Sequence, residues 1–532
     1  MSQVPALRNS AEGISALSSA SENNAAQYQL LAAREQHDAF MRTVFSTEKL
    51  TQNHLWIDMN VYLNDPEQRI AFDQMRVVYS SVLFSPLAEE TKSEIQRELS
   101  TAGSTTQEQE YYFLTHWTRI ADNIAKALLH SAKNNSGVAR NSPHFANLIA
   151  TRIYSELFDV GLYMVYSYTD AISNIHIIGT RMFCYRSDGS TWFALIPAAA
   201  DWRKAVELAN YYGRHVNKRF DLGFPHNNLD STRQHRIAVR QTTVQTDGFV
   251  AAIRLHRAVH YSPIDMINSG FISVEATNFI HRCVYAALPG LITGAPGSAK
   301  TTFLRTLTSA IPRTDPIFSV EYAPELFLDT LRHPVDGLPY FSTLHCHVVQ
   351  GANAEGVGSI PFDEIFKWGL QEDVRRMIIG ELADPESMLT FINALQTGQS
   401  GALATLHAQS VADTVTRVAQ LLSSYYDRSV AWEYLGQNLR FIVHCQVVRS
   451  STQERRFVTG VGWLDFNPNT VHDSDRPPLV HHVFERDFRT GELNRGPGFE
   501  EAMRQLCDAE DHAFGSNFGL ELSNESLMAF GV

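Results

Sequence analysis

Cysteine, long apolar runs and clusters of basic residues are all scarce in this chain. Its 532 residues include five cysteines at long spacings with no CxxC pair, which favours a reducing compartment and argues against a structural zinc module. No stretch reaches about 18 uninterrupted apolar residues, and the N-terminus lacks the apolar core of a signal peptide. We therefore expect a cytoplasmic protein that meets a membrane only peripherally.

Positive charge is also in short supply. Lys and Arg number 44 against 57 Asp and Glu, so the formal net charge is −13. A protein that neutralises many phosphates normally carries a basic face, so direct nucleic-acid binding is not expected. At about 100–200 residues per domain, the length allows two to four domains with full hydrophobic cores.

Changes in composition divide the chain into five regions. Residues 1–45 are rich in Ser, Ala, Asn and Gln and predict a disordered arm, and residues 46–145 show helical spacing that predicts an extra, largely helical region with a linker. Residues 146–260 contain short strand-like runs around one helical segment, which predicts a small α/β domain. Strands alternate with helices over residues 261–448, as in a parallel-rich α/β sheet, and residues 449–532 form a C-terminal extension.

The strongest motif is GxxxxGK[ST] at Gly294, Gly297, Lys300 and Thr301, within LITGAPGSAKTTFLRTL. An apolar strand, a glycine turn and a helix follow in the order that lets backbone N–H groups and a helix N-terminus surround phosphate oxygens. Lys300 would reach the β and γ phosphates, and the Thr301 hydroxyl would hold Mg²⁺. We expect ATP and Mg²⁺ to bind at Gly294, Ala295, Pro296, Gly297, Ser298, Ala299, Lys300, Thr301 and Thr302.

Hydrolysis also needs a carboxylate opposite the γ-phosphate. The run RRMIIGELADPES predicts a buried strand over residues 376–379 with Glu381 just beyond its end, where ligand chemistry occurs in parallel sheets. Glu381 is the candidate general base, although an exposed loop glutamate would give the same pattern. Two other apolar strands end in Glu321 and His407, which we expect at the same edge.

Other histidines carry weaker signals. A lone histidine after an apolar run, such as His407, is more often a core or loop residue than a catalytic one. His345 and His347 in LHCHVV could suggest a metal site, but no further ligand stands near them in the sequence. We expect these two to be strand surface residues.

Together the segments GAPGSAKTT, VEYAPEL, IIGELADPES and TGQSGALATLHAQS resemble the Walker A, Asp-box, Walker B and His-box motifs of the secretion ATPases of type II and type IV secretion and of type IV pili. The segment between the second and third motifs is most similar to the type IV secretion and conjugation branch. SNIHII, CYRSDG, AVRQTTV and FVAAIRLHR are similar to the N-terminal domain of that family. The resemblance covers residues 150–448.

This resemblance implies a two-domain α/β protein, with a RecA-like P-loop motor, that assembles into a hexameric ring and binds ATP between its domains. It implies catalytic roles for Lys300, Glu321, Glu381 and His407, and phosphate contacts from the N-terminal domain, whose matching arginines are Arg186, Arg240 and Arg254. Ordinary strand-surface charge is the alternative for each arginine. The implied partners are inner-membrane components of a secretion or pilus machine, at the inner face of the inner membrane.

The motifs also depart from the family pattern. Tyr322 stands where the Asp box has Asp, Ala383 and Gln371 where arginines are usual, and Gln399 where a histidine is usual. Ala299 would cost about 1–2 kcal/mol if its position requires φ > 0. The catalytic set is nevertheless complete, so we expect hydrolysis, with a slow rate as one outcome.

These observations leave four functions to weigh. The first is a motor for a type IV secretion or conjugation apparatus, and a type IV pilus assembly or retraction motor is the alternative within the same family. A nucleotide-binding ring that has lost hydrolysis is a third. A DNA translocase is a fourth, and the net charge disfavours it.

Overall fold

The computed structural model divides into two compact units, Met1–Leu255 and His256–Val532. Each unit has its own sheet, so the predicted α/β class is confirmed. The structure describes residues 11–131, 138, 140–186, 189–216, 218–229, 235–241, 248–255, 260–322, 325–333, 337–341, 343–348, 360–372, 374–396, 401–449, 454–464 and 477–514. Within these ranges no helix is long and apolar enough to cross a bilayer.

The first unit begins with a long helix where the composition suggested a disordered arm. Helix α1 spans Ala11–Val44, and Leu30, Ala33, His37 and Met41 on it are buried. These residues recur every three or four positions, so they share one face, which packs against α6. The composition of residues 1–45 as a whole does not reveal this short buried stripe.

Helices dominate the rest of the N-terminal half, and most begin at a side-chain cap. Asp65 caps α4 and Ser85 caps α5, each followed by proline at the first helical turn, and Thr105 and Glu108 form a capping box on α6. The helices here are α2 (Thr47–Gln52), α3 (Met59–Asn64), α4 (Pro66–Leu83), α5 (Pro86–Ala102), α6 (Thr106–Thr115), α7 (Trp117–Ser131), α9 (Ser142–Phe158) and α10 (Met164–Ser167).

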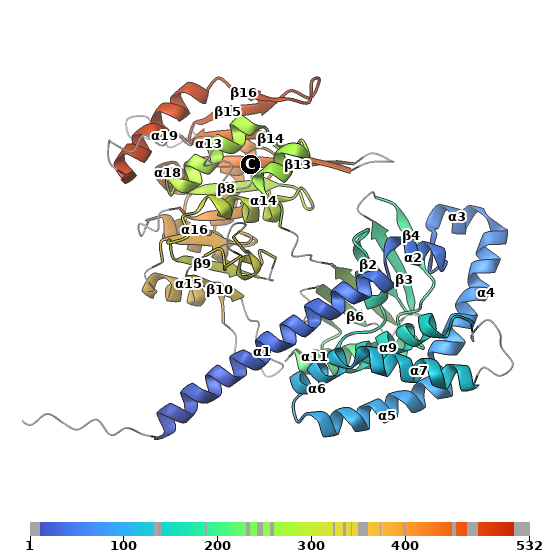
Figure 1. Ribbon diagram of the computed structural model, residues 1–532. Coiled ribbons are helices and arrows are strands. Elements are labelled where there is room, and N and C mark those ends of the chain that lie inside the picture. Colours follow the sequence, from blue (N-terminus) through green and yellow to red (C-terminus); the bar gives the residue numbers. More distant parts are fainter. Residues whose placement is uncertain are drawn as a thin grey trace, which may run out of the picture. The chain divides into compact units, whose positions relative to one another are not determined.

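An antiparallel sheet completes this unit (Figure 1). Its order is β1-β4-β3-β2-β7-β6-β5, and α11 (Trp202–His215) packs near β7. The edge strand β1 comes from the region predicted to be helical, so residues 46–145 contribute to the same sheet as the residues that follow. The strands are β1 (Trp56–Asp58), β2 (Ile172–Ile178), β3 (Arg181–Arg186), β4 (Thr191–Ala194), β5 (His226–Asn228), β6 (Arg236–Gln241) and β7 (Phe249–Arg254).

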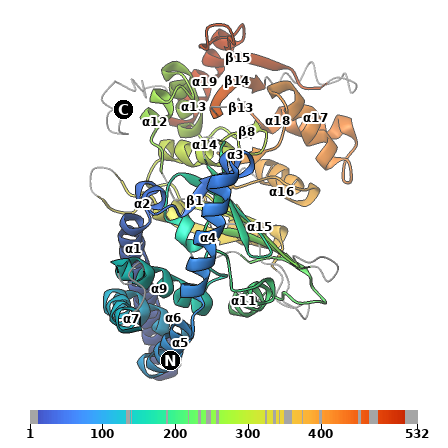
Figure 2. The same cartoon turned by 90° about the vertical axis from the view of Figure 1, so that its right-hand side faces the viewer.

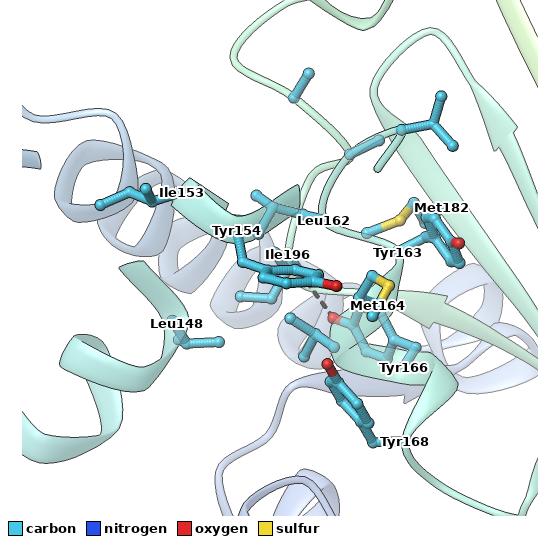
Figure 3. Packing of buried hydrophobic residues seen from close by; sticks show 14 of the residues in the cluster. Leu148, Ile153, Tyr154, Leu162, Tyr163, Met164, Tyr166, Tyr168, Met182 and Ile196 are labelled. Atoms are coloured by element: carbon cyan, nitrogen blue, oxygen red, sulfur yellow. Dashed lines mark hydrogen bonds between the residues drawn. The ribbon is translucent and has the colours of Figure 1, made fainter. Parts of the chain in front are cut away.

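One hydrophobic core extends from Leu30 to Leu255 in this unit. Tyr166 lies at its centre, where its hydroxyl donates to the Leu55 carbonyl and accepts from the Ile196 amide at 3.0 Å (Figure 3). Both hydrogen-bonding functions of this buried phenol are therefore satisfied, as burial requires.

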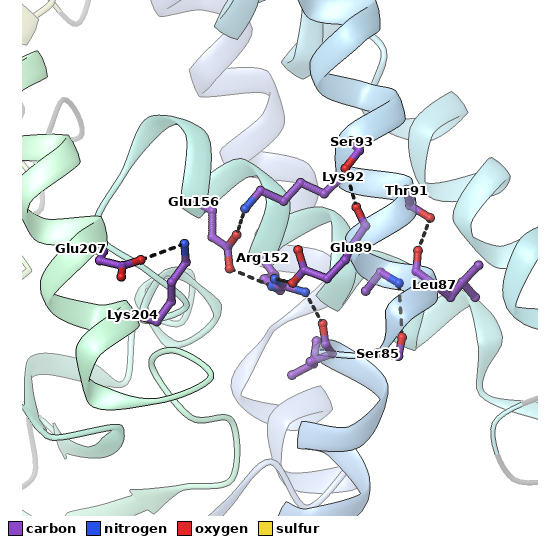
Figure 4. A network of polar contacts seen from close by, with 12 residues as sticks. Ser85, Leu87, Glu89, Thr91, Lys92, Ser93, Arg152, Glu156, Lys204 and Glu207 are labelled. Atoms are coloured by element: carbon purple, nitrogen blue, oxygen red, sulfur yellow. Dashed lines mark hydrogen bonds and ion pairs between the residues drawn. The ribbon is translucent and has the colours of Figure 1, made fainter.

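Charged side chains are buried between the helices of the same unit. Arg152 on α9 donates to Glu156 at 2.8 Å and to the Leu83 carbonyl at 2.6 Å, and it also pairs with Glu89 (Figure 4). Lys92 from α5 pairs with Glu156 as well. A cavity of about 410 Å³ lies beside this network, between α5, α9 and α11.

The second unit is built on a nine-stranded sheet of order β10-β9-β11-β12-β8-β13-β14-β15-β16. The first six strands in that order pair in parallel, and β14, β15 and β16 add antiparallel hairpins. The strands are β8 (Gly290–Gly294), β9 (Ile317–Glu321), β10 (Leu344–Val348), β11 (Arg376–Ile379), β12 (Leu403–Leu406), β13 (Phe441–Arg449), β14 (Glu454–Leu464), β15 (Val480–Arg486) and β16 (Leu493–Arg495).

Helices cover this sheet, and α14 packs on β8 and β12 (Figure 1). The buried Arg376 fixes the amino end of β11, since its guanidinium donates to Asp315 at 2.7 Å and to the Val284 carbonyl at 2.8 Å. The helices are α12 (Pro263–Asn268), α13 (Val274–Tyr285), α14 (Lys300–Leu307), α15 (Phe362–Gln371), α16 (Pro385–Gln396), α17 (Val411–Leu422), α18 (Arg428–Asn438) and α19 (Phe499–Phe514).

The region expected to be a C-terminal extension continues this sheet. Strand β14 pairs with β13 along its length, and α19 packs along β15 (Figure 2). Val458, Trp463 and Phe484 share one core with Phe303 and Ile292 of the P-loop region. The sheet therefore continues past residue 448, where the change of sequence pattern had suggested a boundary.

Candidate nucleotide site

The four strands that carry the predicted site residues end at one edge of the second sheet. In the register, Leu406 of β12 lies beside Thr293 of β8, and Ile379 of β11 lies beside Val320 of β9 and Ala404 of β12. The residues that follow, Gly294, His407, Gly380-Glu381 and Glu321, therefore line the carboxyl edge together. Strand β12 lies between the P-loop strand β8 and β11, so His407 lies between Lys300 and Glu381.

The P-loop backbone has the turn conformations that phosphate binding requires. Gly294 has φ +145° and Gly297 has φ +77°. A Cβ on Gly294 would come within 2.0 Å of the Cys445 carbonyl oxygen, so only glycine fits there. Ser298 Oγ is buried with no hydrogen-bond partner among the described residues. The loop thus combines exposed backbone N–H groups with a free hydroxyl, which suits a phosphate.

Ala299 has φ +71° and ψ 25°, a left-handed conformation. It precedes α14 directly and provides no side-chain cap for that helix. The sequence raised this possibility, and the structure confirms that alanine stands where glycine is favoured. The strain amounts to about 1–2 kcal/mol.

A chain of contacts joins Lys300, His407 and Glu381. Lys300 Nζ lies 3.0 Å from the Ala295 carbonyl oxygen and 3.1 Å from His407 Nδ1, and His407 Nε2 lies 2.7 Å from Glu381 Oε1. Because an ammonium group can only donate, the Lys300 contact requires Nδ1 as the acceptor and Nε2–H as the donor to the Glu381 carboxylate. The Gly294 carbonyl oxygen also lies 3.1 Å from Nδ1 and is the acceptor for the other tautomer. The imidazole therefore bridges the cation and the carboxylate.

The position of Glu381 is fixed by the neighbouring strand β12. Thr405 Oγ1 donates to the Gly380 carbonyl at 2.6 Å, and the Leu382 amide donates to the Thr405 carbonyl at 2.8 Å. These contacts clamp the backbone on both sides of Glu381. Its side chain is 39% exposed, so water can reach the carboxylate.

Glu321 is the buried carboxylate of the site. It accepts hydrogen bonds from the amides of Glu325 at 3.0 Å and Leu326 at 2.9 Å. Burial raises its pKa to about 7, because desolvation of the charged form outweighs those two hydrogen bonds. A carboxyl group with a pKa near neutrality can exchange protons at physiological pH.

Thr301, the residue expected to hold Mg²⁺, has an acidic neighbour. Thr301 Oγ1 donates to Glu325 Oε2 at 3.4 Å. Glu325 therefore places a carboxyl group beside the hydroxyl expected to bind Mg²⁺, and its own amide donates to Glu321. Oxygen ligands of this kind fit Mg²⁺, which normally keeps several waters.

The residues that depart from the family motifs differ in their contacts and exposure. The Tyr322 hydroxyl donates to Asp384 Oδ2 at 2.6 Å, so the tyrosine connects β9 to the start of α16. Ala383 is exposed, and Gln371 is exposed at the end of α15. Gln399 lies outside the described residues.

One residue of this site was missed from sequence. Arg456 on β14 donates from Nε to the Gly297 carbonyl at 2.8 Å, and its guanidinium also pairs with Glu454 at 3.0 Å. The residue lies 159 positions from Gly297 and belongs to no motif. Only the pairing of β13 with β14 brings it to the P-loop, so no local signal could have identified it.

The three arginines expected to reach the phosphates all belong to the first unit. Arg186 ends β3 and lies 5.3 Å from the Trp192 ring, while Arg240 on β6 and Arg254 on β7 are exposed. Arg254 pairs with Asn174 in the strand register, and Arg186 is on the next strand along, opposite Ile172. Arg186 and Arg254 thus lie near the same end of this sheet.

Comparisons with known proteins agree with the motif order. Residues 228–478 match the family model described as "Type II/IV secretion system protein". A putative conjugal transfer protein of Mycobacterium tuberculosis is 27% identical over 214 residues, which cover 40% of this chain and 57% of the relative. The type IV secretion system protein PtlH of Bordetella pertussis is 29% identical over 196 residues, which cover 36% of this chain and 54% of that protein.

The chain therefore spans little more than half the length of these two relatives. The X-ray structure of the Legionella pneumophila ATPase DotB covers 58% of this chain and 81% of its own, at 16% identity and a TM-score of 0.42. The match over residues 228–478 includes the P-loop, β9, β11 and β12. Over these residues the chain is similar to type II/IV secretion system proteins, and a conjugal transfer protein and a type IV secretion system protein are among its relatives.

Proposed function

We propose that this chain is the ATP-hydrolysing motor of a type IV secretion or conjugation machine. The observation that carries the proposal is the contact chain Lys300–His407–Glu381 at the mouth of the P-loop. A nucleotide-binding loop that only held a ligand would have no need of a carboxylate clamped opposite its lysine. Type IV secretion is proposed because a relative in that system shares this region of the chain.

The first step is binding of ATP by the loop. Backbone N–H groups of the loop between Gly294 and Thr302, other than Pro296, and the Ser298 hydroxyl would bind the phosphates, and the N-terminus of α14 adds its positive dipole end. Lys300 then exchanges the Ala295 carbonyl and His407 for phosphate oxygens. The Thr301 hydroxyl, with Glu325 beside it, would hold Mg²⁺, which neutralises charge on the phosphates.

The second step is attack of water on the γ-phosphate. Once Lys300 has turned to the phosphates, His407 still donates to Glu381 and keeps that carboxylate oriented, and the other carboxylate oxygen can accept a proton from water. Glu321, at the end of the adjacent strand β9, supplies a second acidic group. Its raised pKa suits a group that holds a proton for part of the cycle.

Arg186, Arg240 and Arg254 are proposed to complete the site when the two domains close around ATP. Guanidinium groups stabilise negative charge on a transferring phosphoryl group. The motor would be a homohexamer that works at the inner face of the inner membrane with membrane-embedded components. DNA is then cargo of the machine and not a direct ligand of a chain with net charge −13.

Steady-state phosphate release by the full chain tests the proposal. Glu381→Gln should lower the rate by about 10²–10⁴-fold and leave ATP binding intact, because the amide cannot take a proton. Glu386→Gln is the matched control, because Glu386 is exposed five residues further along the same segment. Equal background rates for the wild type and Glu381→Gln would contradict the motor and favour a nucleotide-binding ring. Stimulation of hydrolysis by DNA at low salt would favour a translocase instead.

A further inference from the structure

The edge strand β10 carries two histidines on one face. His345 and His347 are two residues apart, so their side chains point the same way, while Cys346 between them points to the opposite face. In sequence these histidines lack a third ligand, and a metal site was therefore not expected. The fold brings a third potential ligand to them that the sequence spacing does not show.

The third group is Glu372, which follows α15. His345 Nδ1 lies 2.8 Å from Glu372 Oε2. One potential ligand atom from each of His345, His347 and Glu372 lies within 4.8 Å of the other two. Helix α15 packs against β9 and returns its C-terminal end to β10, so the contact joins residues that no spacing rule would connect.

The surroundings of His347 favour a bound ion over a free imidazole. Its ring lies 4.6 Å from the Phe318 ring and 5.7 Å from the Trp368 ring. Its Nε2 is buried without a hydrogen-bond partner in the described part of the chain. The side chains of His345 and Glu372 remain 36% and 34% exposed, which leaves an entry path from solvent.

We propose that His345, His347 and Glu372 form a binding site for a divalent transition metal of the zinc class. Two imidazoles and one carboxylate are a ligand set that suits Zn²⁺ and leaves a fourth position for water. Mg²⁺ and Ca²⁺ prefer oxygen ligands, so they do not match two imidazoles. Small side-chain movements bring three atoms at these separations to normal zinc distances of about 2.0–2.2 Å.

This site is separate from the nucleotide site. Strand β10 lies four strand spacings from the P-loop strand β8 in the sheet order, which corresponds to about 19 Å. A bound ion would tie the end of α15 to the edge strand β10. Residues 374–381 follow directly, so the ion would restrain the segment that enters β11 and carries Glu381. It would also cover part of an edge that could pair with another strand.

Zinc titration of the full, untagged chain by calorimetry tests the site. We expect one Zn²⁺ per chain in the wild type, no such binding in His345→Ala or His347→Ala, and binding about tenfold to a hundredfold weaker in Glu372→Gln. His482→Ala is the matched control, because His482 forms a similar exposed contact with Glu485 at 2.9 Å on β15. Each variant should bind ADP as the wild type does, which shows that the second unit is folded.

A second readout uses Trp368. Cu²⁺ bound beside His347 should quench the fluorescence of this tryptophan, and Trp368→Phe should remove most of the quenching. Zinc binding that survives both histidine substitutions would overturn the proposal. So would zinc binding that millimolar Mg²⁺ displaces. If an alanine variant fails to bind ADP, His347→Gln serves in its place, since it keeps the volume of the side chain and removes the imidazole.

Discussion

The two units of this chain hold their charged groups in different ways. In Met1–Leu255, Arg152 and Glu156 pair along one helix, α9, and each side chain is only 3% exposed. In His256–Val532, His407 and Glu381 meet at a sheet edge, with side chains 42% and 39% exposed. The first pair is sealed from water, and the second pair faces it.

The difference separates structural charges from chemical ones. A buried charge that loses its partner is left desolvated, so the pair must stay together for the unit to stay folded. A half-exposed pair can open at small cost, because water replaces the lost partner. Groups that must exchange partners during a reaction therefore belong at the sheet edge.

The largest effect is expected from a substitution that breaks the buried Arg152–Glu156 pair. Arg152→Ala leaves Glu156 and Glu89 without the guanidinium and should lower the free energy of unfolding of the first unit by about 3–5 kcal/mol. ATP binding to the second unit should not change. Calorimetric unfolding of the full chain with and without nucleotide measures both effects.

The control for this variant is Arg119→Ala. Arg119 pairs with Glu98 at the surface of the same unit, with side chains 47% and 36% exposed. Removing this pair should lower the free energy of unfolding by about 1 kcal/mol or less. An equal decrease in the free energy of unfolding for Arg152→Ala and Arg119→Ala would show that burial does not distinguish the two pairs.

The next largest effect is a pH dependence of stability that comes from Glu321, the buried carboxylate described above at the nucleotide site. Its pKa of about 7 in the folded protein lies above the usual value near 4.5, so the folded state holds a proton that the unfolded state loses between these values. Stability should therefore fall as the pH rises through this window, by an amount on the order of 3 kcal/mol in the absence of nucleotide.

Glu321→Gln removes this titration, and its amide oxygen can still accept the Glu325 and Leu326 N–H groups. Urea unfolding at about pH 5 and about pH 8 should show a smaller difference for the variant than for the wild type, with the variant the more stable of the two at the higher pH. Phosphate release should fall at the same time. Parallel stability profiles for the two proteins would contradict the raised pKa.

The smallest effect is expected at Ala299. Ala299→Gly relieves the left-handed strain at φ +71° and should raise stability by about 0.5–1 kcal/mol, after the larger chain entropy of unfolded glycine is subtracted. Ala295→Gly is the matched control, because the φ of Ala295 is not positive. A melting temperature that falls equally in both variants would show that Ala299 carries no strain.

The sequence predicted that the residues of the candidate nucleotide site would meet at one sheet edge because each lies in a short contiguous motif. Lys300, Glu321, Glu381 and His407 each follow an apolar strand, and parallel pairing brings the ends of such strands together. The left-handed backbone at Ala299 was anticipated for the same reason, since the motif has glycine at that position. The α/β class followed from alternation of strands and helices.

Contacts between distant segments could not be predicted in this way. Arg456 reaches Gly297 only through a hairpin, and Glu372 reaches His345 only through the path of α15. Helix α1 was missed because four buried positions among many polar ones do not change the mean composition. In each case the information lies in packing between elements and not in the order of neighbouring residues.

The hairpin of β13 and β14 sets a limit on how this chain can be shortened. A chain cut after Arg449 would leave β13 with a free edge over the positions that now pair with Glu454–Trp463. Such an edge is a template for aggregation, and the cut would also release the Gly297 carbonyl from Arg456. We therefore expect a shortened chain to need β14 together with β15 and α19, which share its core, well beyond the last recognisable motif.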